Sequence, residues 1–221
     1  MSRPPIRLVL ASASEARRHT LRRAGIDATV VVSDVDEDRV VAEATGRHGE
    51  LEPCDVALLL ARAKAETVAY GDDATGDLVV GCDSVLELDG QALGKPADAA
   101  DAVARWQAMR GRSGVLHTGH WLVDLRDEND GGTGATLGAT ASTVVHFAQL
   151  SDAEIEAYVA TGEPLRVAGA FTVDGLGGAF VTAIEGDYHT VVGISLPLLR
   201  ELVAEAGVGW FDLTRRTPST T

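Results

Sequence analysis

The sequence predicts an α/β fold, and three observations lead to that class. Apolar runs of strand length alternate with segments of helical character along most of the chain. The chain opens in the order strand, helix, strand, which is the start of an α/β unit. Two long strand-like segments, residues 115–125 and 140–147, predict an antiparallel pair. With 221 residues, the chain is long enough for one large domain or for one domain with two lobes.

The first part of the chain divides into three segments. Residues 6–11 are aliphatic and partly β-branched, which is typical of a buried strand. Residues 15–24 predict a helix, because Ser14 is a suitable N-cap and Gly25 a suitable C-cap. Residues 27–32 predict a second strand. A helix N-terminus at the carboxyl end of a strand is where α/β folds bind ligands.

The middle of the chain alternates polar and apolar segments. Residues 35–49 are polar and predict an irregular segment. Residues 55–70 predict a helix, and residues 78–82 predict a fully buried strand. Residues 85–93 predict a hairpin with a tight turn at Asp89-Gly90. We expect the side chains of the 55–70 helix that face inward to be Val56, Leu59, Leu60, Ala63 and Val68.

The rest of the chain predicts three helices and a loop. Residues 98–109 form the first of these helices, and the glycine-rich residues 127–138 predict an exposed, mobile loop. Residues 151–161 predict a helix with a capping box, and residues 196–206 predict the last helix. We expect a single domain over residues 1–213 and a disordered tail over residues 214–221.

Composition excludes some classes of function. The formal net charge is −14, so a broad nucleic-acid-binding surface, which needs an excess of Lys and Arg, is not expected. No apolar run approaches the roughly 20 residues that span a bilayer, and the N-terminal apolar stretch is too short for a signal peptide. We therefore expect a cytoplasmic protein without a membrane partner. Cys54 and Cys82 are expected to be reduced thiols, with a disulfide as the alternative.

Ser12, Ser14 and Arg17 form the first candidate binding element. A strand that enters a helix through two serines offers hydroxyls, free backbone N–H groups and a helix dipole to an anion. Arg17, one turn into the helix, can add a bidentate phosphate contact. The alternative is structural: Ser14 caps the helix and the arginine side chain is solvated.

Asp83 is the second candidate, because it directly follows a buried strand. A carboxylate at the end of a strand faces the crevice, where it can bind a hard metal ion and activate water. The alternative is that Asp83 caps the turn that follows.

Two lysines are candidates for phosphate binding, and the sequence has no others. Lys95 lies between a glycine and a proline. The glycine lets the backbone pass close to a ligand, and the proline restricts the conformation of the chain after the lysine. Lys64 lies late in a predicted helix. Solvated surface cations are the alternative for both. Glu37 belongs to an acidic run after the second strand, of which one or two members can ligate a divalent ion.

His117 and His120 are close in sequence but do not predict a zinc site. Positions three apart on a strand point to opposite faces, and no third ligand lies at a suitable spacing.

These segments, in this order, resemble the Maf family of nucleoside triphosphate pyrophosphatases, also called septum-formation inhibitor proteins. The resemblance runs from about residue 8 to residue 207, and each motif is short, but ten in order make a specific signal. The matching motifs are Leu10-Ala11-Ser12-Ala13-Ser14 with Arg17, Asp36-Glu37, Leu60-Ala61-Arg62-Ala63-Lys64-Ala65, Cys82-Asp83-Ser84-Val85, Leu93-Gly94-Lys95-Pro96, Thr118-Gly119, Tyr158 with Thr161-Gly162-Glu163-Pro164, Ala168-Gly169-Ala170-Phe171, Ile184-Glu185-Gly186-Asp187-Tyr188 and Val191-Val192-Gly193.

The resemblance implies a central mixed twisted sheet flanked by helices, with a nucleotide cleft between two lobes, and often a homodimer. It implies hydrolysis of a nucleoside triphosphate to the monophosphate and pyrophosphate with Mg²⁺ or Mn²⁺. A non-catalytic, nucleotide-binding regulator of septum formation is the alternative function. Asp83 would activate water and share the metal with Glu37. The implied phosphate-binding residues are Ser12, Ser14, Arg17, Lys64 and Lys95.

The sequence departs from the family pattern at places that bear on the nucleobase. Glu15 and Ala16 replace a proline and an arginine, and Ser84 replaces a threonine. Asp174 stands where one branch carries a glutamine, and these three places bear on the nucleobase. A separate departure is Gly114, which stands where a histidine is usual. We count Ser84 and Asp174 among the substrate-binding residues, and the preferred nucleotide is not inherited from a well-marked branch.

Overall fold

The computed structural model describes residues 6–71 and 76–214, and its centre is a mixed sheet of seven strands. The strand order is β2-β1-β3-β5-β6-β7, with β4 beside one end of β3. β1 pairs in parallel with β2 and β3, whereas the other pairs are antiparallel. The strands are β1 (Leu8–Ala11), β2 (Thr29–Val30), β3 (Leu78–Leu88), β4 (Gln91–Leu93), β5 (Ser113–Asp124), β6 (Thr136–Phe147) and β7 (Val181–Glu185).

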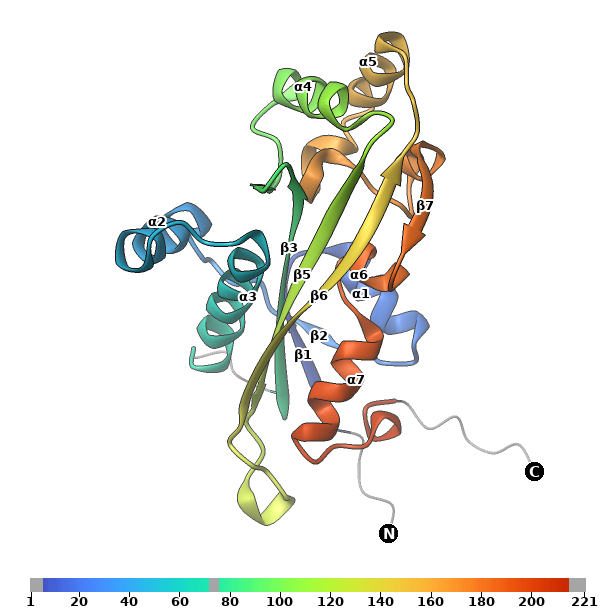
Figure 1. The fold of residues 1–221 in the computed structure, drawn as a ribbon. Helices are drawn as coiled ribbons and strands as arrows, with labels where there is room; N and C mark the ends of the chain where they lie inside the picture. The colour runs from blue at the N-terminus through green and yellow to red at the C-terminus, as the bar shows by residue number, and fades with distance from the viewer. Residues whose placement is uncertain (1–5, 72–75, 215–221) are drawn as a thin grey trace, which may run out of the picture.

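Helices cover both faces of this sheet, which confirms the predicted α/β class. Figure 1 shows α2 and α3 on one face, α1, α6 and α7 on the other, and α4 and α5 together at one end. The helices are α1 (Glu15–Arg23), α2 (Glu37–His48), α3 (Pro53–Ala69), α4 (Ala99–Met109), α5 (Asp152–Ala160), α6 (Tyr188–Val192) and α7 (Leu196–Glu205). Short 3-10 helices are η1 (Glu128–Asp130), η2 (Pro164–Arg166), η3 (Ala168–Ala170), η4 (Leu176–Phe180) and η5 (Trp210–Asp212).

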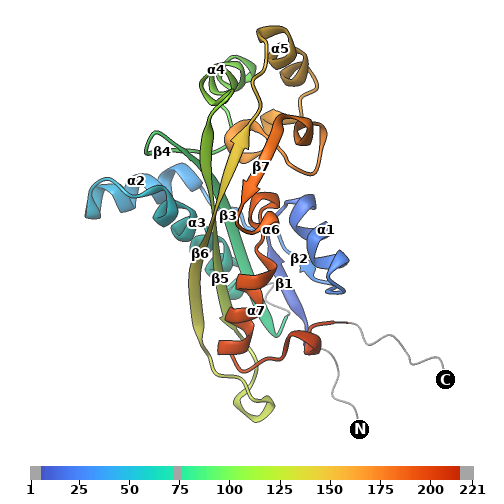
Figure 2. The same ribbon diagram turned by 45° about the vertical axis from the view of Figure 1, so that its right-hand side comes forward.

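The hydrophobic core divides along the length of the central strands. One cluster joins β1, the first half of β3 and α7, and a second joins the far end of β3 to α4 and α5. The turned view in Figure 2 separates α4 and α5 at one end from β1, α1 and α7 at the other. Two lobes therefore share the same long strands. None of the described helices is long and apolar enough to cross a membrane.

β3 changes its partner part of the way along. It pairs with β1 through Leu78–Gly81 and with β4 through Leu86–Leu88. On that side, residues 82–85 have no strand partner among the described residues, while β5 runs along the opposite side. The sheet is thus open at one edge in the middle of a buried strand, directly beyond the carboxyl end of β1.

α3 lies unusually close to the sheet because two glycines face it. A Cβ on Gly81 would lie 2.2 Å from the carbonyl oxygen of Ala61, and a Cβ on Gly119 would lie 2.3 Å from that of Ala57. Ala57, Ala61 and Ala65 are fully buried. This spacing of four residues puts the three alanines in one stripe, so the helix backbone approaches β3 and β5 directly.

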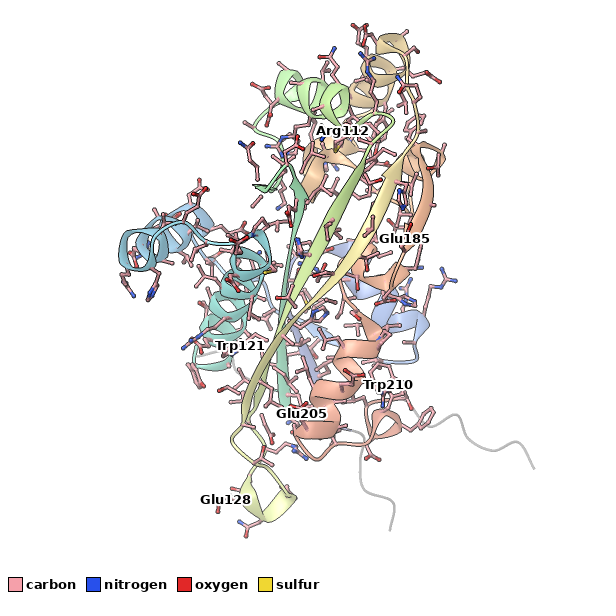
Figure 3. All side chains as sticks on the ribbon, in the orientation of Figure 1. Arg112, Trp121, Glu128, Glu185, Glu205 and Trp210 are labelled. Carbon is pink, nitrogen blue, oxygen red and sulfur yellow. The ribbon has the colours of Figure 1, made fainter. Side chains whose placement is uncertain are left out.

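The alanine stripe corrects the predicted inward face of α3. Leu60 and Val68 are buried as predicted, but Val56, Leu59 and Ala63 are only partly buried. The larger apolar residues were expected inside, whereas close approach to glycine requires small ones. Trp121 lies on the same side of the sheet (Figure 3), and the guanidinium of Arg62 lies 5.0 Å from the centroid of its ring.

α2 contradicts the prediction that residues 35–49 are irregular. The Asp36 side chain accepts a hydrogen bond from the backbone N–H of Arg39 and caps the helix, and Gly49 ends it. These cap signals are in the sequence, but α2 has no buried residue. An apolar stripe, on which the prediction of a helix mainly depends, is therefore missing. Glu37 is the first residue of the helix.

Other bounds also differ from those predicted. β3 continues through the point where two separate strands were expected, β2 is shorter than residues 27–32, and β6 begins at Thr136 inside the predicted loop. The Asp124 carboxylate accepts hydrogen bonds from the backbone and hydroxyl of Thr133, which fixes part of that loop. β7 and α6 were not predicted. Of the predicted tail, Thr214 pairs with Ile26, and residues 215–221 lie outside the described residues.

Substitution of Gly119 by alanine should separate α3 from the sheet. The added Cβ meets backbone atoms of Ala57 and Leu58, which cannot rotate away. We expect a loss of about 1–3 kcal/mol in the free energy of unfolding, the usual cost of overpacking, measured by urea denaturation. Gly46→Ala in α2 is the control, because nothing lies within 4 Å of its Cβ and the helix should be unchanged or slightly stabilised. Equal stability of both variants would contradict the close-packing argument.

Candidate active site

A cleft of about 1210 Å³ lies at the open edge of β3. The turn between β1 and α1, the start of α2, one face of α3, and η2 and η3 contribute residues to its walls. All the site residues predicted from sequence line this cleft, namely Ser12, Ser14, Arg17, Glu37, Lys64, Asp83, Ser84, Lys95 and Asp174. Segments from distant parts of the chain therefore meet at one place, where the sheet leaves room for a ligand.

The guanidinium of Arg17 is buried in the wall of the cleft and binds protein acceptors. Its Nε donates to the carbonyl oxygen of Gly193 (2.7 Å), and Nη1 donates to the Ser12 hydroxyl (3.0 Å) and the Cys82 carbonyl oxygen (2.8 Å). Nη2 donates to the Ser84 hydroxyl (3.0 Å). Four of the five N–H groups of an arginine are thus used within the protein. Cys82 lies on the unpaired edge of β3, so Arg17 satisfies a carbonyl that no strand reaches.

Ser12 and Ser14 shape the entrance to α1. The Ser14 hydroxyl accepts from the backbone N–H of Arg17 and caps the helix, and the Ser12 hydroxyl accepts from the backbone N–H of Ser14. The structural and the ligand-binding interpretations of these serines are compatible, because both serines also line the cleft. The N-terminal turn of α1, with its positive dipole end, therefore faces the cavity.

Lys64, Asp83 and Glu37 form a connected charged group in the cleft. The Lys64 ammonium lies 2.5 Å from Oδ1 of Asp83 and 2.8 Å from Oε1 of Glu37. The side chains of Lys64 and Asp83 are 12% and 10% exposed, whereas that of Glu37 is 43% exposed. The glycine contacts that bring α3 onto the sheet bring Lys64 to Asp83, since Gly81 on β3 faces Ala61 and Ala65.

Burial dominates the ionisation of Asp83. It raises the pKa of the carboxyl above its ordinary value, while the positive charges of Lys64 and Arg17 act in the opposite direction and the negative charge of Glu37 adds to the rise. A carboxylate in these surroundings is a stronger base than one in water, and the positive charges of its two cationic neighbours stabilise its ionised form. It can therefore accept a proton from a nearby water molecule.

Lys95 lines the cleft from a loop that is held by hydrogen bonds to its backbone. The side chain of Arg105 donates to the carbonyl oxygens of Gly94 (2.6 Å) and Lys95 (3.4 Å), and the backbone N–H of Gly169 also donates to Gly94. Lys95 itself is exposed. Its ammonium forms no ion pair with the described residues, so its charge is available to a ligand.

Arg166 is a cleft residue that the sequence analysis missed. It lies at the end of η2, is exposed, and lines the cleft. Within the described part of the chain, its guanidinium forms no ion pair or hydrogen bond. The sequence shows only an arginine two residues after Pro164, and nothing in that spacing indicates that it lines a cleft together with Lys64 and Asp83.

The donors in the cleft fit a divalent cation that is shared with a phosphate ligand. The described residues contain no group of three or more His, Cys, Asp and Glu side chains that could hold a metal ion alone. Asp83 and Glu37 supply two carboxylates on one wall. Mg²⁺ and similar ions are commonly held by one or two carboxylates, with waters and substrate phosphates completing the coordination.

The two histidines considered for zinc have structural partners instead. His117 binds Glu87 (2.8 Å) and Ser142 (2.8 Å). His120 is buried, donates through Nδ1 to the Thr118 carbonyl oxygen and accepts at Nε2 from the backbone N–H of Ser195. Burial lowers the pKa of His120 to about 4, which keeps the ring neutral.

Both cysteines are free thiols, as predicted. Cys82 is fully buried beside the cleft, and burial raises the pKa of its thiol to about 12. The thiol is therefore uncharged and unreactive near neutral pH.

Comparison with known proteins agrees with this geometry. The model of the Maf-like protein family matches residues 7–206. A nucleoside triphosphate pyrophosphatase of Salinispora tropica is 58% identical over 219 residues, which cover 98% of this chain and 91% of the relative. The same description applies to a Streptomyces avermitilis protein (54% identical; 93% of each chain) and to a Nostoc punctiforme protein (47% identical; 97% of this chain and 98% of the relative). The chain belongs to the Maf-like protein family.

Proposed function

We propose that the protein hydrolyses nucleoside triphosphates, standard or modified, to the nucleoside monophosphate and pyrophosphate. The contact of Lys64 with Asp83 in a large cleft carries the proposal, because it joins a buried base to a cation where a phosphate ligand fits. The printed names of the relatives support the same activity. Its role would be to remove unwanted nucleotides from the cellular pool, with a link to arrest of cell division.

Different residues of the cleft would act as the base and as the cations that bind the phosphates. Oδ1 of Asp83 is held by Lys64, so the other carboxylate oxygen is the one that accepts the proton of the attacking water. The water oxygen bonds to the α-phosphorus as the bond from this phosphorus to the bridging oxygen breaks. Pyrophosphate then leaves with the electron pair. Lys64, Lys95 and Arg166 offset the negative charge of the phosphate oxygens.

A divalent cation, Mg²⁺ or Mn²⁺, is part of the proposal. Asp83 and Glu37 would hold it together with oxygens of the triphosphate, and it would supply charge neutralisation at the phosphates. The proposal also places the enzyme in the cytoplasm, where thiols stay reduced. The family resemblance implies a homodimer, which sedimentation can test.

The experiment that tests the proposal is pyrophosphate release from a panel of nucleoside triphosphates with Mg²⁺ or Mn²⁺. A metal-free reaction is the control. Turnover that yields pyrophosphate and the monophosphate supports the enzyme. Nucleotide binding without pyrophosphate release would favour the second candidate, a non-catalytic nucleotide-binding regulator of septum formation.

Asp83→Asn should reduce kcat by at least about a hundredfold, the lower range for loss of a general base. The change is nearly isosteric, so the thermal unfolding temperature should stay within a few degrees of that of the wild type. Steady-state kinetics and thermal denaturation of the same preparation test both statements. Activity within a few-fold of wild type would show that another carboxylate is the base.

Lys95→Ala and Arg17→Ala should separate ligand binding from structure. Lys95→Ala should lower kcat/KM by a factor that corresponds to about 1.5–3 kcal/mol of lost transition-state stabilisation, the scale of a hydrogen bond to a charged group. The stability of the fold should not change. Arg17→Ala should instead lower the free energy of unfolding by at least about 3 kcal/mol, because it leaves the buried carbonyl oxygens of Cys82 and Gly193 without their side-chain donor. Urea denaturation and kinetics on both variants decide. A stable Arg17→Ala protein that has lost only catalysis would assign Arg17 to the substrate.

Asp174→Gln should change the choice of nucleobase. A carboxylate would repel phosphate, so Asp174 is expected on the part of the cleft that receives the base. An ionised aspartate offers acceptors only, which favours a base with an exocyclic amine, and Ala16 removes a donor that the family pattern supplies. We expect the wild type to prefer GTP or CTP over dTTP or UTP. The substitution should raise the dTTP-to-GTP ratio of kcat/KM. A wild type that prefers dTTP, or a ratio that does not change, would leave a permissive pocket as the better description.

A further inference from the structure

The Glu163 carboxylate lies between the end of α5 and the 172–177 loop, whose last two residues, Leu176 and Gly177, begin η4. Its Oε1 accepts hydrogen bonds from the Tyr158 hydroxyl (2.8 Å), the Thr172 hydroxyl (2.8 Å) and the backbone N–H of Gly177 (2.9 Å). Its Oε2 accepts from the backbone N–H of Leu176 (2.9 Å). Three of these four donors belong to the 172–177 loop, so one carboxylate holds both ends of that loop.

The loop wraps around this carboxylate without spare room. A Cβ on Gly175 would lie 2.5 Å from Oε2 of Glu163, and a Cβ on Gly177 would lie 2.3 Å from the Tyr158 hydroxyl. Tyr158 is in turn fixed in the core, with edge-to-face contacts to Trp106 and Phe180 at centroid distances of 5.5 and 5.2 Å. The aromatic core of one lobe therefore determines where the loop lies, through Tyr158 and Glu163.

Asp174 is at the exposed centre of this loop. It lines the cleft and also a neighbouring cavity of about 310 Å³. Its side chain forms no hydrogen bond or ion pair with the described residues. The backbone of the loop therefore sets where Asp174 stands beside the cleft, and no contact with the described residues fixes its side chain. Glu163 also directly precedes η2, which carries Arg166 to the cleft wall.

We propose that Glu163 is a positioning residue that holds the 172–177 loop and thereby determines which nucleobase Asp174 admits to the cleft. The proposal rests on the pyrophosphatase function proposed above, because the nucleobase belongs to that substrate.

The donor set explains why a carboxylate is needed at this position. All four partners are donors, and an ionised carboxylate is a side chain that only accepts. Burial acts to raise the pKa of Glu163, but the N–H groups of Leu176 and Gly177 and the two hydroxyls hold it below its ordinary value. A glutamine would turn an NH₂ group toward a backbone N–H, so one of the loop contacts would become a repulsion.

The first test measures the loop without any substrate. In Glu163→Gln, the backbone amides of Leu176 and Gly177 should exchange hydrogen about tenfold faster or more, since a hydrogen bond to a charged group is lost. Glu154→Gln is the matched control. Its carboxylate accepts from Ser151 in the capping box of α5 and does not contact the loop. Unchanged exchange at Leu176 and Gly177 in Glu163→Gln would overturn the proposal.

The second test is a double-mutant cycle on substrate choice. Glu163→Gln should change the GTP-to-dTTP ratio of kcat/KM by about fivefold, the scale of one hydrogen bond, and Glu154→Gln should leave it unchanged. In an Asp174→Ala background, Glu163→Gln should no longer change the ratio, because the group that it positions is gone. A shift of equal size in both backgrounds, or no shift in either, would overturn the proposal.

Two further measurements keep the outcome clear. Tyr158→Phe removes a single donor from Glu163 and should act in the same direction with a smaller effect, which serves if Glu163→Gln does not fold. If the wild type releases no pyrophosphate from any triphosphate, the proposed function fails. The cycle is then measured on the dissociation constants of GTP and dTTP, where the same pattern supports the positioning role and a flat ratio overturns it.

Discussion

The guanidinium of Arg17 is the interaction on which the cleft depends. It joins the β1–α1 turn at Ser12, the unpaired edge of β3 at Cys82 and Ser84, and the end of α6 at Gly193. Without it, the buried carbonyl oxygens of Cys82 and Gly193 would lose their side-chain donor, which is costly away from water. A sheet that is open in its middle is stable here because a side chain replaces the missing strand.

The same gap needs a second constraint, which is the close approach of α3. Gly81 and Gly119 on the strands, and alanines on the helix, let the helix backbone lie against the sheet. Lys64 then reaches Asp83 with little of either side chain exposed to water. Small residues in the core and charged residues in the cleft are thus parts of one arrangement, because larger side chains at the glycine positions would move the lysine away from the carboxylate.

The sequence predicted those parts of the site that follow a local signal. Ser14 is an N-cap and lies in the cleft. Asp83 also lines the cleft, but it lies inside β3, whereas it was predicted to follow the end of a strand. The partners of Arg17 could not be predicted, because Gly193 and Cys82 are 176 and 65 residues away. α2 was missed because it buries no side chain, and Arg166 because only the fold brings η2 to the cleft. Local chemistry is readable from sequence, whereas contacts between distant segments depend on topology.

The charges in the cleft account for the proposed need for a divalent cation. Lys64 contributes one positive charge, and Asp83 and Glu37 contribute two negative charges, so this connected group is net negative when both carboxylates are ionised. Most of the N–H donors of the Arg17 guanidinium form hydrogen bonds with protein acceptors. Among the other described residues that line the cleft, Lys95 and Arg166 are then the cations without an ion pair, and Lys64 shares its charge with two carboxylates. Two monovalent cations do not balance the negative charges of both the carboxylates and a triphosphate, so carboxylate and phosphate oxygens would repel each other. A divalent ion shared between these oxygens would reduce that repulsion.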